Sequence, residues 1–486
     1  MAFRKHILSL VVFLAVAVGS TYLALLDESF NEEQYRYAVA SVQNDTDTFA
    51  SDPIFGTMYA EGQLPRQLNP FFLRLLKTIR TGLHVDNALL TFRLLVGPMC
   101  MVFLCGMYFL LFRITASSTV SAFVAILSMG TIETVGTWHW GVGALATVTP
   151  AGLFLALSPF LVRAFVYHRR QPMKLVRGFA LIGLAGNLHL PSAVTLGAIL
   201  LVAYLIERRI RRVTLLATLG SIFAFSICIL PAVLYELSVM HSLAAPTTST
   251  PVEVGTVLSA LRYCPGETLY PELVSQALQW AIYIGVLLGL AVTMLWRHDD
   301  EHTSLHLGIW IWVALLGALV SLGGIGLMQF LATSQKCLVL PPVILQASCW
   351  TMLALFVLLA RGLRNVTRVM RFSPGVLFWA RIVLLLAWLL PSDNCSVVRH
   401  HLYEWFTAGL RESDKPMRLQ ELRDRHVALR EMEAIGLWLR KNTPADTLIV
   451  TNQPRMRVCA RRGVLVIQSD VTMLVQHAPW LIETWH

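Results

Sequence analysis

The sequence predicts an all-α polytopic membrane protein with about eleven transmembrane helices and a small extracytoplasmic α/β domain at its C-terminal end. Of its 486 residues, 56% are hydrophobic and only 14% are charged, whereas soluble globular proteins carry about 25% charged residues. The hydrophobic residues gather in runs of roughly 18 to 25, the length that a helix needs to cross about 30 Å of hydrocarbon. These runs lack polar–apolar alternation, so the spanning elements are helices and not strands.

The formal net charge of +10 would suit nucleic acid. Most lysines and arginines, however, stand at the ends of apolar runs, which is typical of orientation signals and of contacts with anionic lipid headgroups. We therefore expect membrane lipids and no nucleic acid as partners. The eight cysteines show no CxxC or Cys/His spacing, so neither a metal nor another cofactor is expected. Cys395 and Cys459 could pair if their segment faces an oxidising compartment.

The first apolar run, residues 1–26, follows Arg4 and Lys5. A signal peptide would have a shorter apolar core and a small-residue cleavage site, so we expect an uncleaved helix with a cytoplasmic N-terminus. The polar segment that follows should lie outside. Within it, residues 70–80 place apolar side chains on one face and Arg74 and Lys77 on the other. This pattern suits a helix on the membrane surface or an ordinary packed loop helix.

Further membrane helices are expected along most of the chain. Their ranges are 89–112, 115–135, 149–167, 213–236, 275–296, 305–328, 337–360 and 374–391. Between the third and fourth of these, both flanks of an apolar stretch are basic and should be cytoplasmic. A hairpin of two short helices, 175–188 and 191–206, keeps both flanks inside and places His189 at its outer apex.

With about eleven crossings the C-terminus lies outside. The transmembrane domain then covers residues 1–391, with an outer loop at 27–88, and the extracytoplasmic domain covers 392–486. In the latter, a charged helix is expected over 413–441 and buried strands over 447–451 and 463–468, packed against Leu437 and Trp438. Most of the polar sequence lies on the outer side of the membrane in this topology, and we therefore expect the functional site there.

Asp27 and Glu28 emerge directly at the end of the first helix. A carboxylate at this depth can act as a general base towards a hydroxyl, because partial burial raises its pKa. The alternative is a solvated pair of acids at a helix end.

Other polar residues near the outer ends of helices are candidates for binding a substrate. His189 lies at membrane depth, where an ionisable residue suggests function, and a lipid phosphate needs a cationic contact. The predicted substrate-binding residues are Asp52, His189, Arg36, Arg262 and Lys336, with Arg455 and Arg457 as further cationic candidates. We expect Asp27, Glu28, Asp52, His189 and Lys336 to converge on one outer pocket.

Three stretches carry a resemblance to a known family: residues 48–53 (TFASDP), 187–192 (NLHLPS) and 438–451 (WLRKNTPADTLIVT). With the helix layout, they resemble the GT-C superfamily and bacterial polytopic membrane proteins related to it. The resemblance implies a glycosyltransferase that takes sugar from a polyprenyl-phosphate donor at the outer face of the bacterial inner membrane, with Asp27 or Glu28 as catalytic base. The alternative is a non-catalytic accessory or scaffold subunit of a larger membrane complex. A transporter is disfavoured, because no inverted repeat is found.

Overall fold

The structure is a computed structural model in which most of the described residues are helical. It describes residues 2–42, 68–134, 139–168, 171–208, 212–243, 285, 309–324, 342–369, 373–407 and 417–465, except positions 86, 445, 452 and 454. These residues fall into two compact units. Unit 1 comprises Met1–Leu23, Leu95–Ala232 and Tyr270–Ser396, and unit 2 comprises Ala24–Leu94, Val233–Leu269 and Val397–His486.

Within the described ranges, five helices are long and apolar enough to cross a membrane. They are α1 (Ala2–Leu26), α6 (Ala88–Thr115), α8 (Pro150–His168), α11 (Arg212–Leu243) and α15 (Pro342–Val369). A sixth is added if Gly375–Leu389 and Asp393–Phe406, which meet at 91°, form one broken span. The chain is therefore a helical protein with several candidate membrane spans. The full number of about eleven remains a prediction, and of the expected helix at 275–296 the structure describes residue 285 alone.

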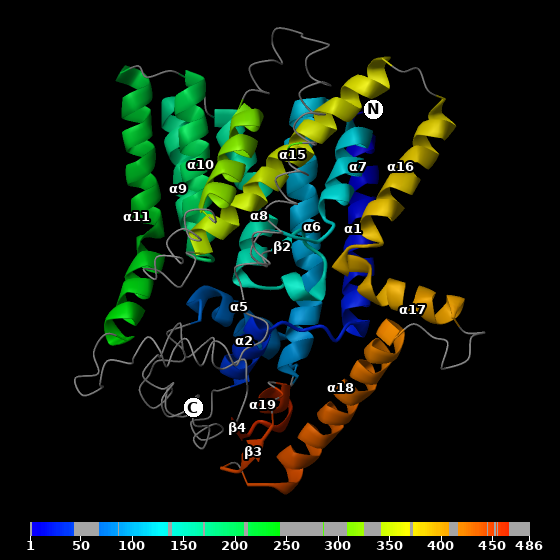
Figure 1. The fold of residues 1–486 in the computed structure, drawn as a ribbon. Coiled ribbons are helices and arrows are strands. Elements are labelled where there is room, and N and C mark those ends of the chain that lie inside the picture. The colour runs from blue at the N-terminus through cyan, green and yellow to red at the C-terminus, as the bar shows by residue number, and fades with distance from the viewer. Residues whose placement is uncertain are drawn as a thin grey trace. The chain divides into compact units, whose positions relative to one another are not determined.

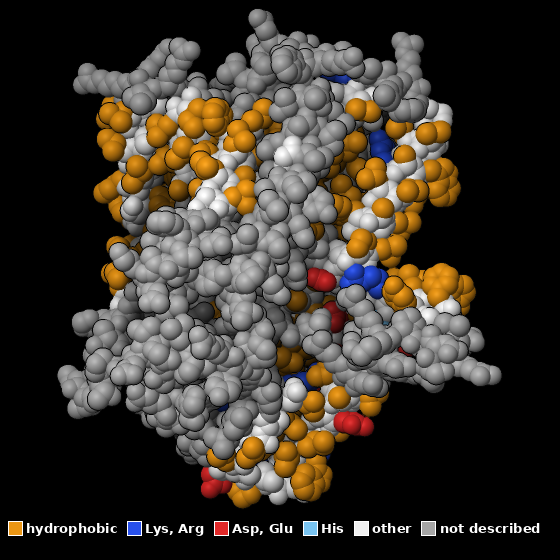
Figure 2. All heavy atoms as spheres, viewed as in Figure 1, with side chains coloured by type: hydrophobic (Ala, Val, Ile, Leu, Met, Phe, Trp, Pro, Cys, Tyr) orange, Lys and Arg blue, Asp and Glu red, His pale blue; other side chains and the backbone are white. Residues whose placement is uncertain are grey.

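The candidate spans differ in how much protein surrounds them. In α15, 89% of the apolar window is buried, whereas in α1 and α11 the share is 28%. Large apolar side chains cover the open sides of α11 and α16 (Pro374–Leu389), where Figure 2 shows them as orange surfaces. Exposed apolar surface of this extent is typical of a helix that faces lipid. By this measure α15 is an interior helix, while α1 and α11 have open sides suited to hydrocarbon.

Unit 1 is organised around α15, which packs against α10 (Leu190–Arg208), α7 (Ser118–Ser128) and β2 (His139–Trp140) (Figure 1). The α7 helix is shorter than the spanning helix expected at 115–135. Ser117 caps its start by accepting from the backbone N–H of Val120.

After α7 the chain forms a short antiparallel hairpin of β1 (Ile132–Glu133) and β2. Asn394, which lies far along the sequence, stabilises this turn. The amide oxygen of Asn394 accepts from the backbone N–H and the hydroxyl of Thr131 at 2.8 and 2.9 Å, and its nitrogen donates to the Val142 carbonyl at 3.0 Å. These bonds satisfy buried backbone groups outside any helix. The apolar segment after α7 can therefore remain buried without forming a helix.

The predicted hairpin of two short helices is present as α9 (Pro172–Ala185) and α10. In the turn between them, the Asn187 amide donates to the carbonyl of Cys228 at 2.9 Å and accepts from the N–H of Ala232 at 3.1 Å. Residues 228 and 232 would pair with each other in an unbroken helix. Pro231 disturbs α11 at this turn, and the Asn187 side chain satisfies both backbone groups there.

In unit 2, α5 (Pro70–Gly82) matches the helix expected at 70–80. Its apolar face is buried by protein: the Phe72 ring meets Tyr37 of α2 (Glu32–Val42) edge-on, with centroids 4.9 Å apart. Leu73 and Leu76 are buried on the same face. Of the two alternatives for this helix, the packed loop helix is the one that the contacts support.

The C-terminal part of unit 2 contains α17 (Ser396–Phe406), α18 (Met417–Asn442), β3 (Leu448–Val450), α19 (Arg455–Ala460) and β4 (Gly463–Leu465). The two strands pair in parallel, with α19 between them in the chain and packed beside α18 (Figure 1). Met456 and Val464 form a small core with Leu439 of α18. The expected packing partners Leu437 and Trp438 are wrong: they are 46% and 60% exposed. Around α18 they lie about 200° and 100° from Leu439, which faces the core.

Candidate functional site

The segment after α1 has a well-defined local structure. The Asp27 carboxylate accepts from the Ser29 backbone N–H at 2.9 Å and from the Ser29 hydroxyl at 2.6 Å, which is an Asx turn. Next, Asn31 and Gln34 exchange side-chain-to-backbone hydrogen bonds of 2.8 and 2.9 Å at the start of α2. This reciprocal pair is a capping box with Asn in the first position. The two motifs fix the link that carries Asp27 and Glu28.

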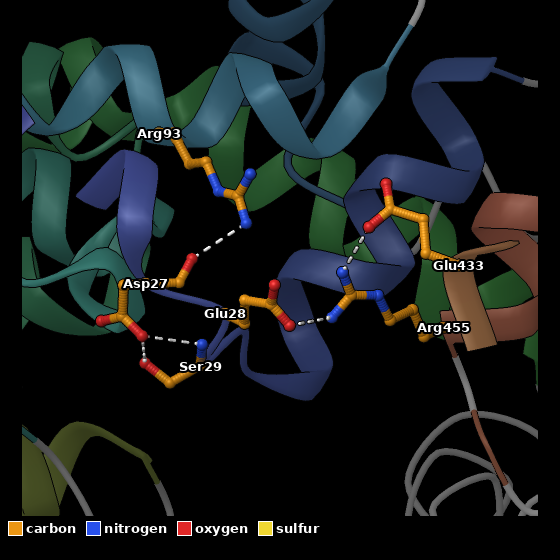
Figure 3. Close-up of polar contacts among 6 residues, drawn as sticks. All are labelled: Asp27, Glu28, Ser29, Arg93, Glu433 and Arg455. Carbon is orange, nitrogen blue, oxygen red and sulfur yellow. Dashed lines mark hydrogen bonds and ion pairs between the residues drawn. The ribbon is translucent and has the colours of Figure 1, made fainter. Parts of the chain in front are cut away.

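Glu28 forms a buried ion pair with Arg455 of α19. The nearest Glu28 oxygen lies 3.5 Å from one terminal nitrogen of Arg455, and the other terminal nitrogen lies 3.0 Å from Glu433 of α18 (Figure 3). The Arg455 side chain is 3% exposed and that of Glu28 is 13% exposed. Because buried charges need partners, Arg455 links the loop after α1 to both α18 and α19.

A second arginine, Arg93 of α6, approaches the same loop. It donates from a terminal nitrogen to the Asp27 carbonyl at 2.9 Å, and its guanidinium carbon lies 5.3 Å from the centroid of the Phe30 ring. The Nε atoms of Arg93 and Arg455 are buried and have no hydrogen-bond partner among the described residues. Buried donors of this kind are the groups that a bound anion can satisfy.

The cluster of Asp27, Glu28, Glu433, Arg93 and Arg455 holds three carboxyl groups and two guanidinium groups within unit 2 (Figure 3). Its described ion pairs involve Glu28 and Glu433, and the Asp27 carboxylate is oriented by Ser29. Chemically, this combination offers an oriented carboxylate that can accept a proton beside two cations that can hold an anion.

The residues predicted from the sequence divide between several locations. Asp27 and Glu28 lie together, Arg455 joins them, and Arg36 is a half-buried residue of α2 in the same unit. Asp52, Arg262 and Lys336 lie outside the described residues. His189 belongs to unit 1. The expected common pocket therefore remains a prediction.

His189 stands immediately before α10, at its N-terminal cap. Its Nδ1 lies 2.7 Å from the Ser192 hydroxyl, which donates to the Gln346 side chain of α15 at 2.9 Å. The Ser192 backbone N–H also points to Nδ1, at 3.3 Å. These contacts give His189 a structural role as a helix cap. Arg457, a further cationic candidate, is also structural: it is buried and donates to the Val464 carbonyl at 3.2 Å.

Sequence reasoning missed two members of the cluster. Arg93 had a usable signal, because an arginine in the first turns of a strongly apolar helix suggests function by its position alone. Glu433 had none, since it is one of many charged residues on α18. The free thiols of Cys395 and Cys459 lie in different units. Among the described residues, no group of three His, Cys, Asp or Glu side chains could hold a metal ion.

Comparison of the chain with known protein families, curated proteins and solved structures found no match. Functional inference therefore rests on the cluster itself and on the resemblance carried by the sequence motifs.

Proposed function

We propose that the chain is a GT-C-like membrane glycosyltransferase that uses a lipid-phosphate-linked sugar at the outer face of the bacterial inner membrane. The observation that carries this proposal is the position of Asp27 and Glu28. They follow an apolar candidate span directly and lie with two buried arginines, Arg93 and Arg455. A base beside cations at the end of a membrane helix suits a substrate with an anionic group at the lipid surface.

In the proposed reaction, the acceptor hydroxyl attacks the anomeric carbon of the sugar. Its proton passes to the Asp27 carboxylate, the new glycosidic C–O bond forms, and the C–O bond to the phosphate breaks. The electron pair of that bond leaves with the polyprenyl phosphate. Asp27 is favoured over Glu28 as base, because the Glu28 carboxylate is held by Arg455 in an ion pair.

Arg93 is assigned to the phosphate of the donor. Its planar guanidinium offers several donors in a fixed fork, and one of them, Nε, has no partner among the described residues. Negative charge grows on the phosphate oxygen as the sugar bond breaks, so a cation there stabilises the transition state more than the ground state. Arg455 positions Glu28 and contributes to the same positive field.

The proposal includes the topology derived from the sequence: about eleven crossings, a cytoplasmic N-terminus and an extracytoplasmic C-terminal domain. It requires the loop after α1 to face outward, since polyprenyl-phosphate sugars are consumed on that side. The proposed partners are membrane lipids and the lipid-linked donor.

The test uses the full chain reconstituted in vesicles with a panel of polyprenyl-phosphate sugars, each carrying a radiolabelled sugar, and a glycolipid extract as acceptor. Label transfer by the unmodified protein is compared with that of Asp27→Asn and Glu28→Gln. Removing a general base lowers the turnover rate about 10²–10⁴-fold, and we expect this for Asp27→Asn. The control is Glu431→Gln, which changes an exposed acid two residues from Glu433 and should leave transfer unchanged.

Full activity of Asp27→Asn would refute the assignment of the base. If no donor in the panel supports transfer and stable protein partners co-purify from native membranes, the chain is a scaffold subunit. The ion pairs of Arg455 with two carboxylates favour that second function, because they are sufficient to join the loop to the C-terminal helices without any chemistry.

A further inference from the structure

We infer that α17 is an interfacial helix whose aromatic face is immersed in the lipid bilayer. The helix has 11 residues, a length of about 16 Å, which is too short to cross the hydrocarbon. It contains no buried residue. An exposed, short helix in a membrane protein can face water, lipid or another protein, and its side-chain pattern distinguishes these surroundings.

Four apolar residues of α17 share one side. At 3.6 residues per turn, Val398, Leu402, Trp405 and Phe406 fall within an arc of roughly 100°. Three of them are well exposed: Leu402 is 40% exposed, Trp405 71% and Phe406 72%. Figure 2 shows hydrophobic side chains at the surface where Figure 1 labels α17.

The polar residues of α17 are unevenly exposed. The His400 side chain is 15% exposed and pairs with Glu404, four residues on, at 3.3 Å, whereas the side chains of Glu404 and His401 are 42% and 65% exposed. A helix at the surface of a soluble protein buries its apolar face, and α17 leaves its apolar face open. An exposed apolar face is stable where the surroundings of the protein are themselves apolar.

Lipid is the favoured occupant because α17 follows, in the chain, a helix with an exposed apolar surface. Six residues separate it from α16, and α16 exposes Phe378, Trp379 and Val383 at 57%, 64% and 63%. Tryptophan concentrates at the level of the lipid headgroups, where one end of the ring is wet and the other apolar. Trp405 in the last turn of α17 matches this composition.

The experiment measures the surroundings of Trp405 in the full chain reconstituted in phosphatidylcholine vesicles. The emission of Trp405 is obtained as the difference between the unmodified protein and Trp405→Phe. We expect a blue-shifted difference spectrum that is quenched at least twofold by lipids brominated near the headgroup end of the chain and little by aqueous acrylamide. Trp438 of α18, which is 60% exposed, is the matched control, and Trp438→Phe should remove emission that acrylamide quenches and bromolipid does not.

Quenching of Trp405 by acrylamide alone would show that the face is in water. Quenching by neither agent would show that protein covers it, either a second copy or another partner. Both results overturn the inference. If Trp405→Phe does not fold, a benzophenone amino acid replaces Phe406, and irradiation in the same vesicles should cross-link it to phospholipid. A protein cross-link, or no phospholipid adduct, would overturn the inference equally.

Discussion

The Glu28 carboxylate lies 3.5 Å from the guanidinium of Arg455, 427 residues further along the chain. This contact joins the loop after the first helix to the helix between the two C-terminal strands. Together with the packing of α19 against α2, it joins two segments at opposite ends of the sequence within one compact unit. Replacing one partner of the pair tests how that unit is stabilised.

Replacing Arg455 by methionine should destabilise unit 2. The change leaves Glu28 buried without its cation, and loss of one partner of a buried pair costs about 3–5 kcal/mol. The measurement is equilibrium unfolding in mild detergent. Burial raises the pKa of the Cys459 thiol on α19 and the neighbouring Arg455 lowers it. Loss of the arginine alone would therefore slow maleimide labelling, so faster labelling of Cys459, located by mass spectrometry, would report exposure of the thiol.

Two comparisons make this prediction specific. The exposed Arg440 provides the control variant Arg440→Met, which should change stability by less than about 0.5 kcal/mol. The double variant Glu28→Gln with Arg455→Met should be less unstable than the sum of the two single variants, because the pair is coupled. Additive effects would mean that the 3.5 Å contact contributes nothing to stability.

Arg93→Lys tests the proposed phosphate contact. Lysine keeps the charge and loses the planar fork, so we expect the KM for the lipid-phosphate donor to rise roughly tenfold, equivalent to about 1.4 kcal/mol of binding. Turnover should fall further in Arg93→Met. Arg440→Lys, on an exposed helix surface, should alter neither constant. An unchanged KM in both Arg93 variants would assign that arginine to structure alone.

Asn187→Leu should destabilise unit 1. The variant keeps the approximate size of the side chain and leaves the Cys228 carbonyl and the Ala232 N–H without the partners described above. Buried groups left unsatisfied cost about 1–3 kcal/mol. Thermal unfolding in detergent measures the loss, and Asn442→Leu, the same change at an exposed helix end, serves as control. Equal melting temperatures for the two variants would contradict a bridging role.

The topology is tested by paired reporters, one active only in the cytoplasm and one only outside. Fusions after residues 212 and 371 should read as cytoplasmic and a fusion after residue 407 as external, because basic clusters stay inside. A reporter fused after residue 212 that is active outside would contradict the α9–α10 hairpin, because the hairpin places both of its flanks on the cytoplasmic side.

Local sequence patterns predicted much of the fold. The candidate spans α1, α6, α8, α11 and α15 follow from apolar runs, and the hairpin of α9 and α10 follows from basic flanks. The length of α7 could not be predicted, because Asn394 determines the turn after it and lies 263 residues from Thr131. Periodicity likewise located α5 but could not show that α2 covers its apolar face.

The candidate site was predictable only in part for the same reason. Asp27 and Glu28 stood out because acids directly follow an apolar run, whereas Glu433 is one charge among many on α18. Which charges meet depends on tertiary contacts between α19, α18 and the loop after α1. A single sequence contains no direct record of those contacts.

The bridge made by Asn187 has a consequence for the order of synthesis. The ribosome releases Asn187 45 residues before Ala232, so the α9–α10 hairpin can be inserted before the weakened turn of α11 leaves the translocon. The amide is then already present to accept that turn as it enters the bilayer. We therefore expect the hairpin to act on the nascent chain as a docking site for the helix that follows it.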